Sequence, residues 1–140
     1  MVVAPLSERH LEEVRLAVGR ALAQWAPSGD APEQIVDSLE RVLLFLRQNG
    51  SPSVQARQVT SLALAWGTQI ARDAQWRWMS VSEDGAVNPA LVSPGGEWAC
   101  LVVDVVTRMV LRKNGSLRGA FRRICSREIS AENVEVVALT

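Results

Sequence analysis

The chain has no tyrosine, a single histidine, a single lysine and only two cysteines among its 140 residues. One histidine cannot build a histidine-rich metal site, and His10 has no cysteines or carboxylates near it at ligand spacing. Cys100 and Cys125 are too few for a disulfide framework, and their separation fits no zinc motif. We therefore expect free thiols in a reducing compartment, a cytoplasmic location, no metal and no cofactor.

Long apolar runs are also missing. No stretch approaches the roughly 18 apolar residues of a transmembrane helix, and the first residues lack the basic and apolar regions of a secretory signal. No glycine-rich phosphate-binding motif is present. Fifteen basic and fifteen acidic residues cancel, so the overall charge favours neither nucleic acid nor an anionic membrane. We expect the protein to bind neither of them.

The composition that remains is that of a folded domain. Hydrophobic residues make up 48% of the chain and charged residues 21%, and a chain of this size can bury a core without metal or disulfide support. The sequence has no repeat, low-complexity segment or long linker. We expect one domain over residues 1–140, with a helical hairpin in 1–50 and an α+β core in 51–140.

Three helices are predicted in the first half of the chain. Ser7 can cap the first, whose apolar residues recur every three or four positions up to Trp25. Pro32 lies in the first turn of the second helix, where its missing N–H costs nothing, and Asn49-Gly50 ends that helix. Ser51-Pro52 is a similar start signal for the third helix. The first two should form an antiparallel hairpin, and the third should pack on a sheet.

After the third helix, the spacing of the hydrophobic residues changes from about 3.6 to 2, which indicates a strand containing Trp76 and Trp78. Asp84-Gly85 is typical of a hairpin turn. The return strand is expected at residues 89–93, a second turn at 93–96 and a third strand at 97–101.

The run from Cys100 to Arg112 is open to two interpretations. Its many valines favour a strand. However, Asp104, Arg108 and Arg112 recur every four positions, which is the spacing of one helical face, and the first two can pair. We predict a helix from about Val102.

Two further elements complete the predicted fold. Ser116 can cap a short helix over residues 117–125, and residues 134–139 are expected to form a last strand. The fold class is thus α+β. An N-terminal helical hairpin and a third helix pack on a small antiparallel sheet, followed by two shorter helices and a C-terminal strand.

Residues 66–94 combine the end of a small-residue helix, a strand with a W-x-W pattern, an acidic turn and an A-L-x-x-P strand, and an arginine-bearing helix follows. This succession resembles a bacterial domain family of unknown function. The resemblance implies a compact α+β domain similar to the small cytoplasmic proteins of toxin–immunity loci, and it implies no catalytic residues. The matching residues are Gly67, Trp76, Trp78, Asp84, Gly85, Ala90, Leu91, Pro94 and Arg108.

Four tryptophans will cluster if the third helix packs on the sheet. Large aromatic side chains usually build cores, which is our expectation for Trp66 and Trp76. Trp78 and Trp98 are candidates for anchoring a partner, because tryptophan is enriched at interface hot spots. A box for a small ligand is the alternative.

The main charge asymmetry lies near the C-terminal end, where residues 105–127 carry seven basic residues and no acidic one. Three interpretations of this basic stretch remain open. In order of preference they are a solvated helical surface, a docking surface for an acidic protein and a nucleic-acid site. Arginines one helical turn apart can give both helices a basic face. The predicted partner-binding residues are Arg108, Arg112, Arg118, Arg122, Arg123, Trp78 and Trp98.

The only adjacent carboxylates near the turn are Glu83 and Asp84, and neighbours in a hairpin turn point apart, which argues against acid–base catalysis. We predict a non-enzymatic cytoplasmic protein-binding module, an immunity protein that neutralises a cognate toxin by direct binding. An adaptor or chaperone for a secreted protein is the alternative, and an exposed apolar groove would favour it. An enzyme and a small-molecule sensor are the third and fourth hypotheses.

Overall fold

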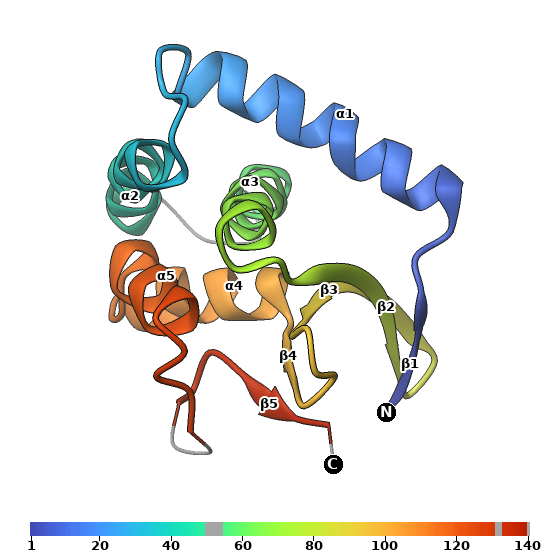
Figure 1. Cartoon of the computed structure of the whole chain (residues 1–140). Helices are drawn as coiled ribbons and strands as arrows, with labels where there is room; N and C mark the ends of the chain where they lie inside the picture. Colours follow the sequence, from blue (N-terminus) through green and yellow to red (C-terminus); the bar gives the residue numbers. More distant parts are fainter. Residues whose placement is uncertain (50–54, 131–132, 140) are drawn as a thin grey trace.

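The computed structural model describes residues 1–49, 55–130 and 133–139, and this part of the chain forms five helices and one five-stranded sheet (Figure 1). The predicted α+β class is confirmed. The helices are α1 (Glu8–Trp25), α2 (Pro32–Gln48), α3 (Ala56–Ala74), α4 (Val102–Arg112) and α5 (Leu117–Cys125). The strands are β1 (Val2–Pro5), β2 (Arg77–Glu83), β3 (Ala86–Val92), β4 (Trp98–Cys100) and β5 (Val137–Ala138).

The sheet is an antiparallel meander in which the strands lie side by side in chain order. Asp84 and Gly85 join β2 to β3 with φ angles of 52° and 84°, as in a two-residue hairpin turn of the predicted kind. Because so short a turn lets pairing resume at once, β3 begins at Ala86, three residues before the predicted start. The last two strands, predicted at 97–101 and 134–139, are shorter in the structure.

The first strand was not predicted. Residues 2–5 are too few to show an alternating pattern, and a proline at their end argues against a central strand. In the structure β1 is an edge strand, where a proline is tolerated, and Pro5 lies opposite Met79 of β2. As a result β2 is a central strand.

The helices form a layer in which α3 is central. Every residue from Leu62 to Gly67 is buried, which requires cover on all sides of the helix. In Figure 1, α2 and α3 are seen nearly end-on, and α1 crosses above them. A short loop joins α1 to α2 as predicted, but α1 packs mainly on α3.

The predicted strip of small residues on α3 allows a close approach to the sheet. A Cβ atom on Gly67 would lie 2.9 Å from Cη2 of Trp78 and 3.0 Å from Cγ1 of Val102. Real Cβ contacts are longer, so any side chain here would displace its neighbours. The helix-on-sheet packing predicted for this strip is confirmed.

Local start signals are confirmed wherever the structure describes them. Ser7 accepts a hydrogen bond from the N–H of His10, and Ser116 accepts one from the N–H of Gly119. Pro32 occupies the first turn of α2. Gly50 and Ser51-Pro52 lie outside the described residues.

The valine-rich run is a helix, as its polar residues predict. One face of α4 buries Val102, Val105, Val106, Met109 and Val110, and Lys113 ends the helix in the left-handed conformation. In the described part of the chain, no helix combines the length and the hydrophobicity needed to cross a bilayer.

Candidate protein-binding surface

Arg118 lies at the start of α5 and contacts α2. Its Nε atom is 2.7 Å from Oδ1 of Asp37, and its backbone N–H donates to Oε1 of the buried Glu40 at 3.3 Å. An exposed ion pair of this kind contributes less than about 1 kcal/mol to stability. Arg118 is therefore partly neutralised within the chain, although about half of its side chain is exposed.

Two other predicted arginines contact the C-terminal segment that precedes β5. Arg123 forms an ion pair with the buried Glu135. The Nε atom of Arg108 donates to the main-chain oxygen of Asp104 at 3.4 Å. Its Nη2 atom donates to the main-chain oxygen of Val134, also at 3.4 Å. These contacts tie α4 and α5 to the same segment, and both guanidinium groups are engaged within the chain.

The remaining two predicted arginines are free in the described structure. Arg112 and Arg122 are exposed, and neither side chain has an ion-pair or hydrogen-bond partner among residues 1–49, 55–130 and 133–139. Lys113, which follows Arg112, is exposed as well. These three cations can therefore contact another molecule without breaking a side-chain ion pair or hydrogen bond within the described part of the chain.

Arg47 brings the ends of two helices together. Its Nε atom donates to the carbonyl of Met109 at 2.9 Å, and its Nη2 atom donates to the carbonyls of Asn114 and Gly115 at 2.5 and 2.6 Å. Those carbonyls belong to the end of α4 and to the connection that leads into α5. The C-terminal end of α2, the end of α4 and the start of α5 thus meet at one corner of the molecule.

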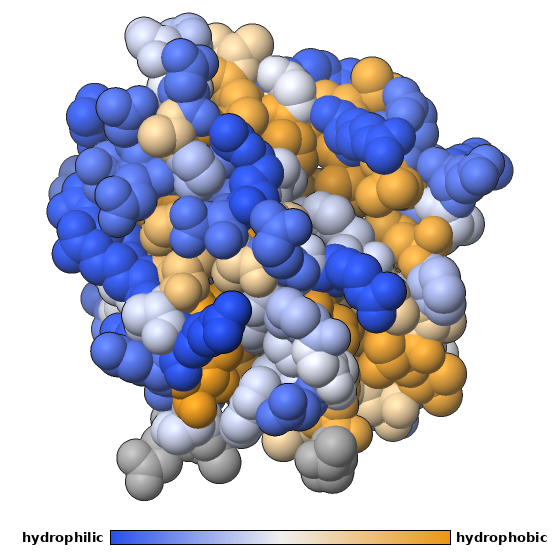
Figure 2. Space-filling view, viewed as in Figure 1, coloured by the Kyte–Doolittle hydropathy of each residue, from blue (hydrophilic) through white to orange (hydrophobic). Residues whose placement is uncertain are grey.

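Two large apolar side chains flank this junction and remain uncovered. Leu44 lies one turn before Arg47 and is 48% exposed, and Leu111 lies on the last turn of α4 and is 59% exposed. Figure 2 shows mainly hydrophilic side chains on the side of the molecule where α2 and α5 lie. We call the following residues the basic corner: Leu44, Leu111, Arg112, Lys113, Arg118 and Arg122.

The two leucines of the basic corner were missed in the sequence. A usable signal was present for Leu44, because it falls outside the stripe made by Ile35, Leu39, Leu43 and Leu46. An apolar residue outside the buried stripe of an amphipathic helix is a candidate contact residue.

The structure does not bring the two predicted tryptophan anchors to the basic corner. Neither lies on an edge of the sheet, because β2 lies between β1 and β3, and β4 lies between β3 and β5. Trp78 is partly buried against Gly67. Trp66 and Trp76 are buried in the core, as predicted.

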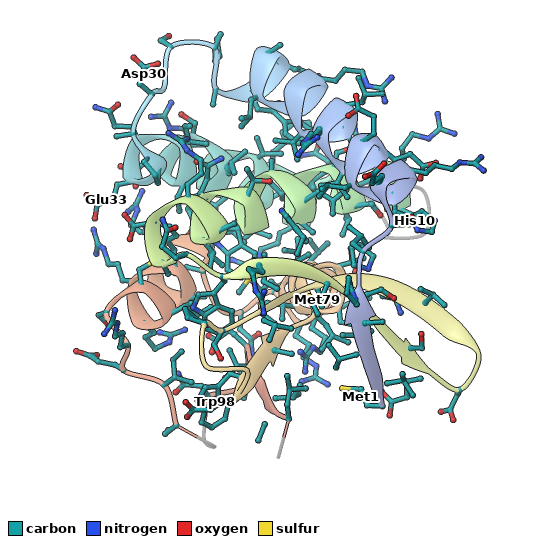
Figure 3. The ribbon with its side chains drawn as sticks, turned by 45° about the vertical axis from the view of Figure 1, so that its right-hand side comes forward. Met1, His10, Asp30, Glu33, Met79 and Trp98 are labelled. Atoms are coloured by element: carbon teal, nitrogen blue, oxygen red, sulfur yellow. The ribbon has the colours of Figure 1, made fainter. Side chains whose placement is uncertain are left out.

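Trp98 lines a groove of about 680 Å³ between the ends of α3 and α5 and the turn that follows β3. Trp76, Asp73, Glu97, Cys125 and Arg127 also line it. We call it the tryptophan groove. Figure 3 shows Trp98 at the end of the molecule opposite α1.

Both cysteines are free thiols, as predicted. Burial, followed by a hydrogen bond to Asp73 and the negative charge of its carboxylate, raises the pKa of Cys125 to about 12. Burial in the core is the main cause that raises the pKa of Cys100 to about 12. A raised pKa keeps both thiols protonated at neutral pH, which disfavours the thiolate form that nucleophilic chemistry needs.

The other candidates for chemistry lie apart from one another. His10, at the start of α1 in Figure 3, has its Nδ1 atom 3.0 Å from Oγ of Ser7. Asp84 is in the exposed hairpin turn, and Glu83 lines a separate shallow groove beside Asp104 and Arg108. Among the described residues, no group of three or more histidine, cysteine, aspartate or glutamate side chains is placed to hold a metal ion.

Comparisons with known proteins found no match among protein-family models, curated proteins or solved structures. The resemblance to a bacterial domain family of unknown function stays a prediction.

Proposed function

We propose that this protein is a non-enzymatic binding module that recognises an acidic surface of a protein partner through its basic corner. In the form that the family resemblance suggests, it is an immunity protein that neutralises a cognate toxin by direct binding. The observation that carries the proposal is that two uncovered leucines flank the junction made by Arg47, and that Arg112, beside one of them, has no side-chain partner among the described residues.

This combination fits the usual anatomy of a protein interface, in which an apolar centre is surrounded by a charged rim. Fully burying a leucine side chain contributes roughly 1.5–3 kcal/mol, so Leu44 and Leu111 can supply affinity. The surrounding cations attract an acidic partner during encounter and raise the association rate. Association should therefore slow as the ionic strength rises.

The five predicted arginines should contribute unequally. Arg112 and Arg122 can engage a partner directly, since nothing in the described chain holds them. Arg118 and Arg123 must first give up Asp37 and Glu135. We therefore expect the two free arginines to matter more for binding than the two that are paired.

A specific observation favours an adaptor or chaperone for a secreted protein as the second candidate. An apolar cleft of about 290 Å³ lies between α1 and β3, and its walls include Leu6, Val14, Leu64 and Val87. Val87 is more than half exposed. An apolar segment of a client protein could bind in this cleft.

The direct experiment is to co-express the protein with the product of the neighbouring gene. If the proposal holds, that product kills cells alone, spares them when this protein is present, and co-purifies with it. Substituting Arg112→Glu and Arg122→Glu together should weaken binding by about tenfold or more, because two attractive charges become repulsive.

The matched control reverses two charges elsewhere. Arg20→Glu with Arg77→Glu makes the same change in net charge on α1 and β2, at exposed positions on two elements that contribute no residue to the basic corner. It should leave the affinity unchanged. A harmless neighbour that does not co-purify, or equal affinity of both double variants, would refute the toxin-blocking proposal. Loss of binding on Val87→Asp alone would favour the chaperone.

A further inference from the structure

Two tryptophans of the tryptophan groove stand in one row across the sheet with a serine between them. The β2–β3 register pairs Arg77 with Val92, and one further step along it places Trp76 opposite Ser93. The N–H of Ser93 donates to the carbonyl of Trp98 at 2.9 Å. Trp76, Ser93 and Trp98 therefore occupy neighbouring strands at the same level, just beyond the paired part of β2 and β3.

The row contains one ring that a ligand can cover. Trp76 is only 5% exposed and Ser93 is buried, whereas Trp98 is half-buried and lines the groove. Its position beside the buried pair fixes where a flat group can stack on it.

The charges around the groove favour a cation. The carboxylates of Asp73 and Glu97 line it, and α3 and α5 both end there, so that the negative ends of two helix dipoles are nearby. Glu33 is close enough to Cys125 to contribute to its high pKa. Arg127 is the one basic residue that lines the groove, and it opposes this preference only in part.

From this lining we infer that the tryptophan groove binds an arginine side chain of another polypeptide, with the guanidinium group stacked on Trp98 and directed at the carboxylates of Asp73 and Glu97. Guanidinium is planar and cationic, and it stacks on aromatic faces while donating to carboxylates. An ammonium group lacks the flat shape.

The size of the groove indicates that the arginine is part of a chain. A volume of about 680 Å³ exceeds what a single guanidinium needs, and the partly buried Ile129 extends the wall beyond Trp98. Ile129 can contact an apolar residue beside the arginine. This site is separate from the basic corner and attracts the opposite charge.

The test is a fluorescence titration of the full chain with capped peptides that contain one arginine between alanine and leucine residues. The protein has five tryptophans and no tyrosine, so its intrinsic fluorescence comes from tryptophan alone, and binding to Trp98→Leu, which lacks the reporter in the groove, is measured by calorimetry. The arginine peptide should bind, and peptides with citrulline or lysine in its place should bind about fivefold or more weakly. Free arginine should bind more weakly than the peptide if a polypeptide is the ligand; equal binding would make the ligand a small molecule and overturn the polypeptide assignment.

Variants locate the site. Trp98→Leu and Glu97→Gln should each weaken binding of the arginine peptide. Arg127→Gln should strengthen that binding, because the competing cation is removed. Trp25→Leu, a partly buried tryptophan on α1, is the matched control and should bind as the unmodified protein does. Circular dichroism checks that Trp98→Leu folds, and Glu97→Gln changes only an exposed side chain.

The inference fails if the arginine peptide does not bind at concentrations up to about 5 mM, a limit that corresponds to an affinity too weak for recognition. It also fails if citrulline binds as well as arginine, or if Trp98→Leu and Glu97→Gln bind like Trp25→Leu.

Discussion

The basic corner and the tryptophan groove differ in shape, composition and charge. The corner is built on helices, with aliphatic side chains and exposed cations around the junction made by Arg47. The groove lies where two helices end beside the sheet, and it combines tryptophans with carboxylates. A chain with fifteen basic and fifteen acidic residues thus has two regions of opposite character. A net charge of zero describes the sum and does not describe either surface.

The two regions are also held in place differently. Arg47 fixes the corner through hydrogen bonds from one side chain to three carbonyls. The groove depends on strand register and on Ser93, which accepts hydrogen bonds from the N–H groups of Glu97 and Trp98. Single substitutions can therefore disturb one region and spare the other, provided that they leave the shared core intact.

The largest effect is expected at the residue on which both regions depend. Trp66 is fully buried on α3, and its indole N–H donates to the carbonyl of Leu117 at the start of α5 at 3.1 Å. Trp66→Ala should lower the free energy of unfolding by about 3–5 kcal/mol, because it leaves a large cavity. Urea denaturation measures this change.

Trp25→Ala is the control for Trp66→Ala, since Trp25 is only partly buried. Its cost should be clearly smaller. If the two substitutions destabilise the protein equally, α3 is not the common support of the two regions.

The next effect should separate the basic corner from the groove. Arg47→Met keeps the length of the side chain but removes all three of its hydrogen bonds, which should cost about 1.5–3 kcal/mol. Binding of an acidic partner should weaken, whereas affinity for the arginine peptide should not change. Arg41→Met removes an exposed arginine from the same helix and should affect stability little. Equal losses at both surfaces would show that the corner and the groove are coupled.

Sequence reasoning predicted the features that depend on neighbouring residues. Ser7 and Ser116 cap helices because a serine oxygen accepts from an N–H three residues later. Asp84-Gly85 makes a tight turn because both residues tolerate positive φ. Four-residue spacing of polar residues identified α4 despite its valines, because burial on one face outweighs intrinsic strand preference.

Features that depend on distant residues were not predictable in the same way. β1 is a strand only because β2 offers it an edge. Of the predicted binding arginines, Arg123 is neutralised by Glu135, and nothing in the sequence shows that this glutamate is near. In the row formed by Trp76, Ser93 and Trp98, the two-residue turn at Asp84-Gly85 already sets the first pair, whereas the longer turn after β3 does not set the β3–β4 register that places Trp98.

The smallest effect concerns the groove alone. Oγ of Ser93 accepts the N–H groups of Glu97 and Trp98 at 3.1 and 3.0 Å, and the serine is buried. Ser93→Ala should cost about 1–2 kcal/mol of stability, because two N–H groups lose their acceptor at a turn where water can replace it in part. The turn that carries Trp98 should loosen, so affinity for the arginine peptide should fall while binding at the basic corner persists. Ser82→Ala, near the β2–β3 turn at the other end of these strands, removes a hydroxyl without changing the turn that carries Trp98 and serves as the control. If Ser93→Ala and Ser82→Ala bind the peptide equally well, Trp98 is not positioned by Ser93, and the row across the sheet does not determine the shape of the groove.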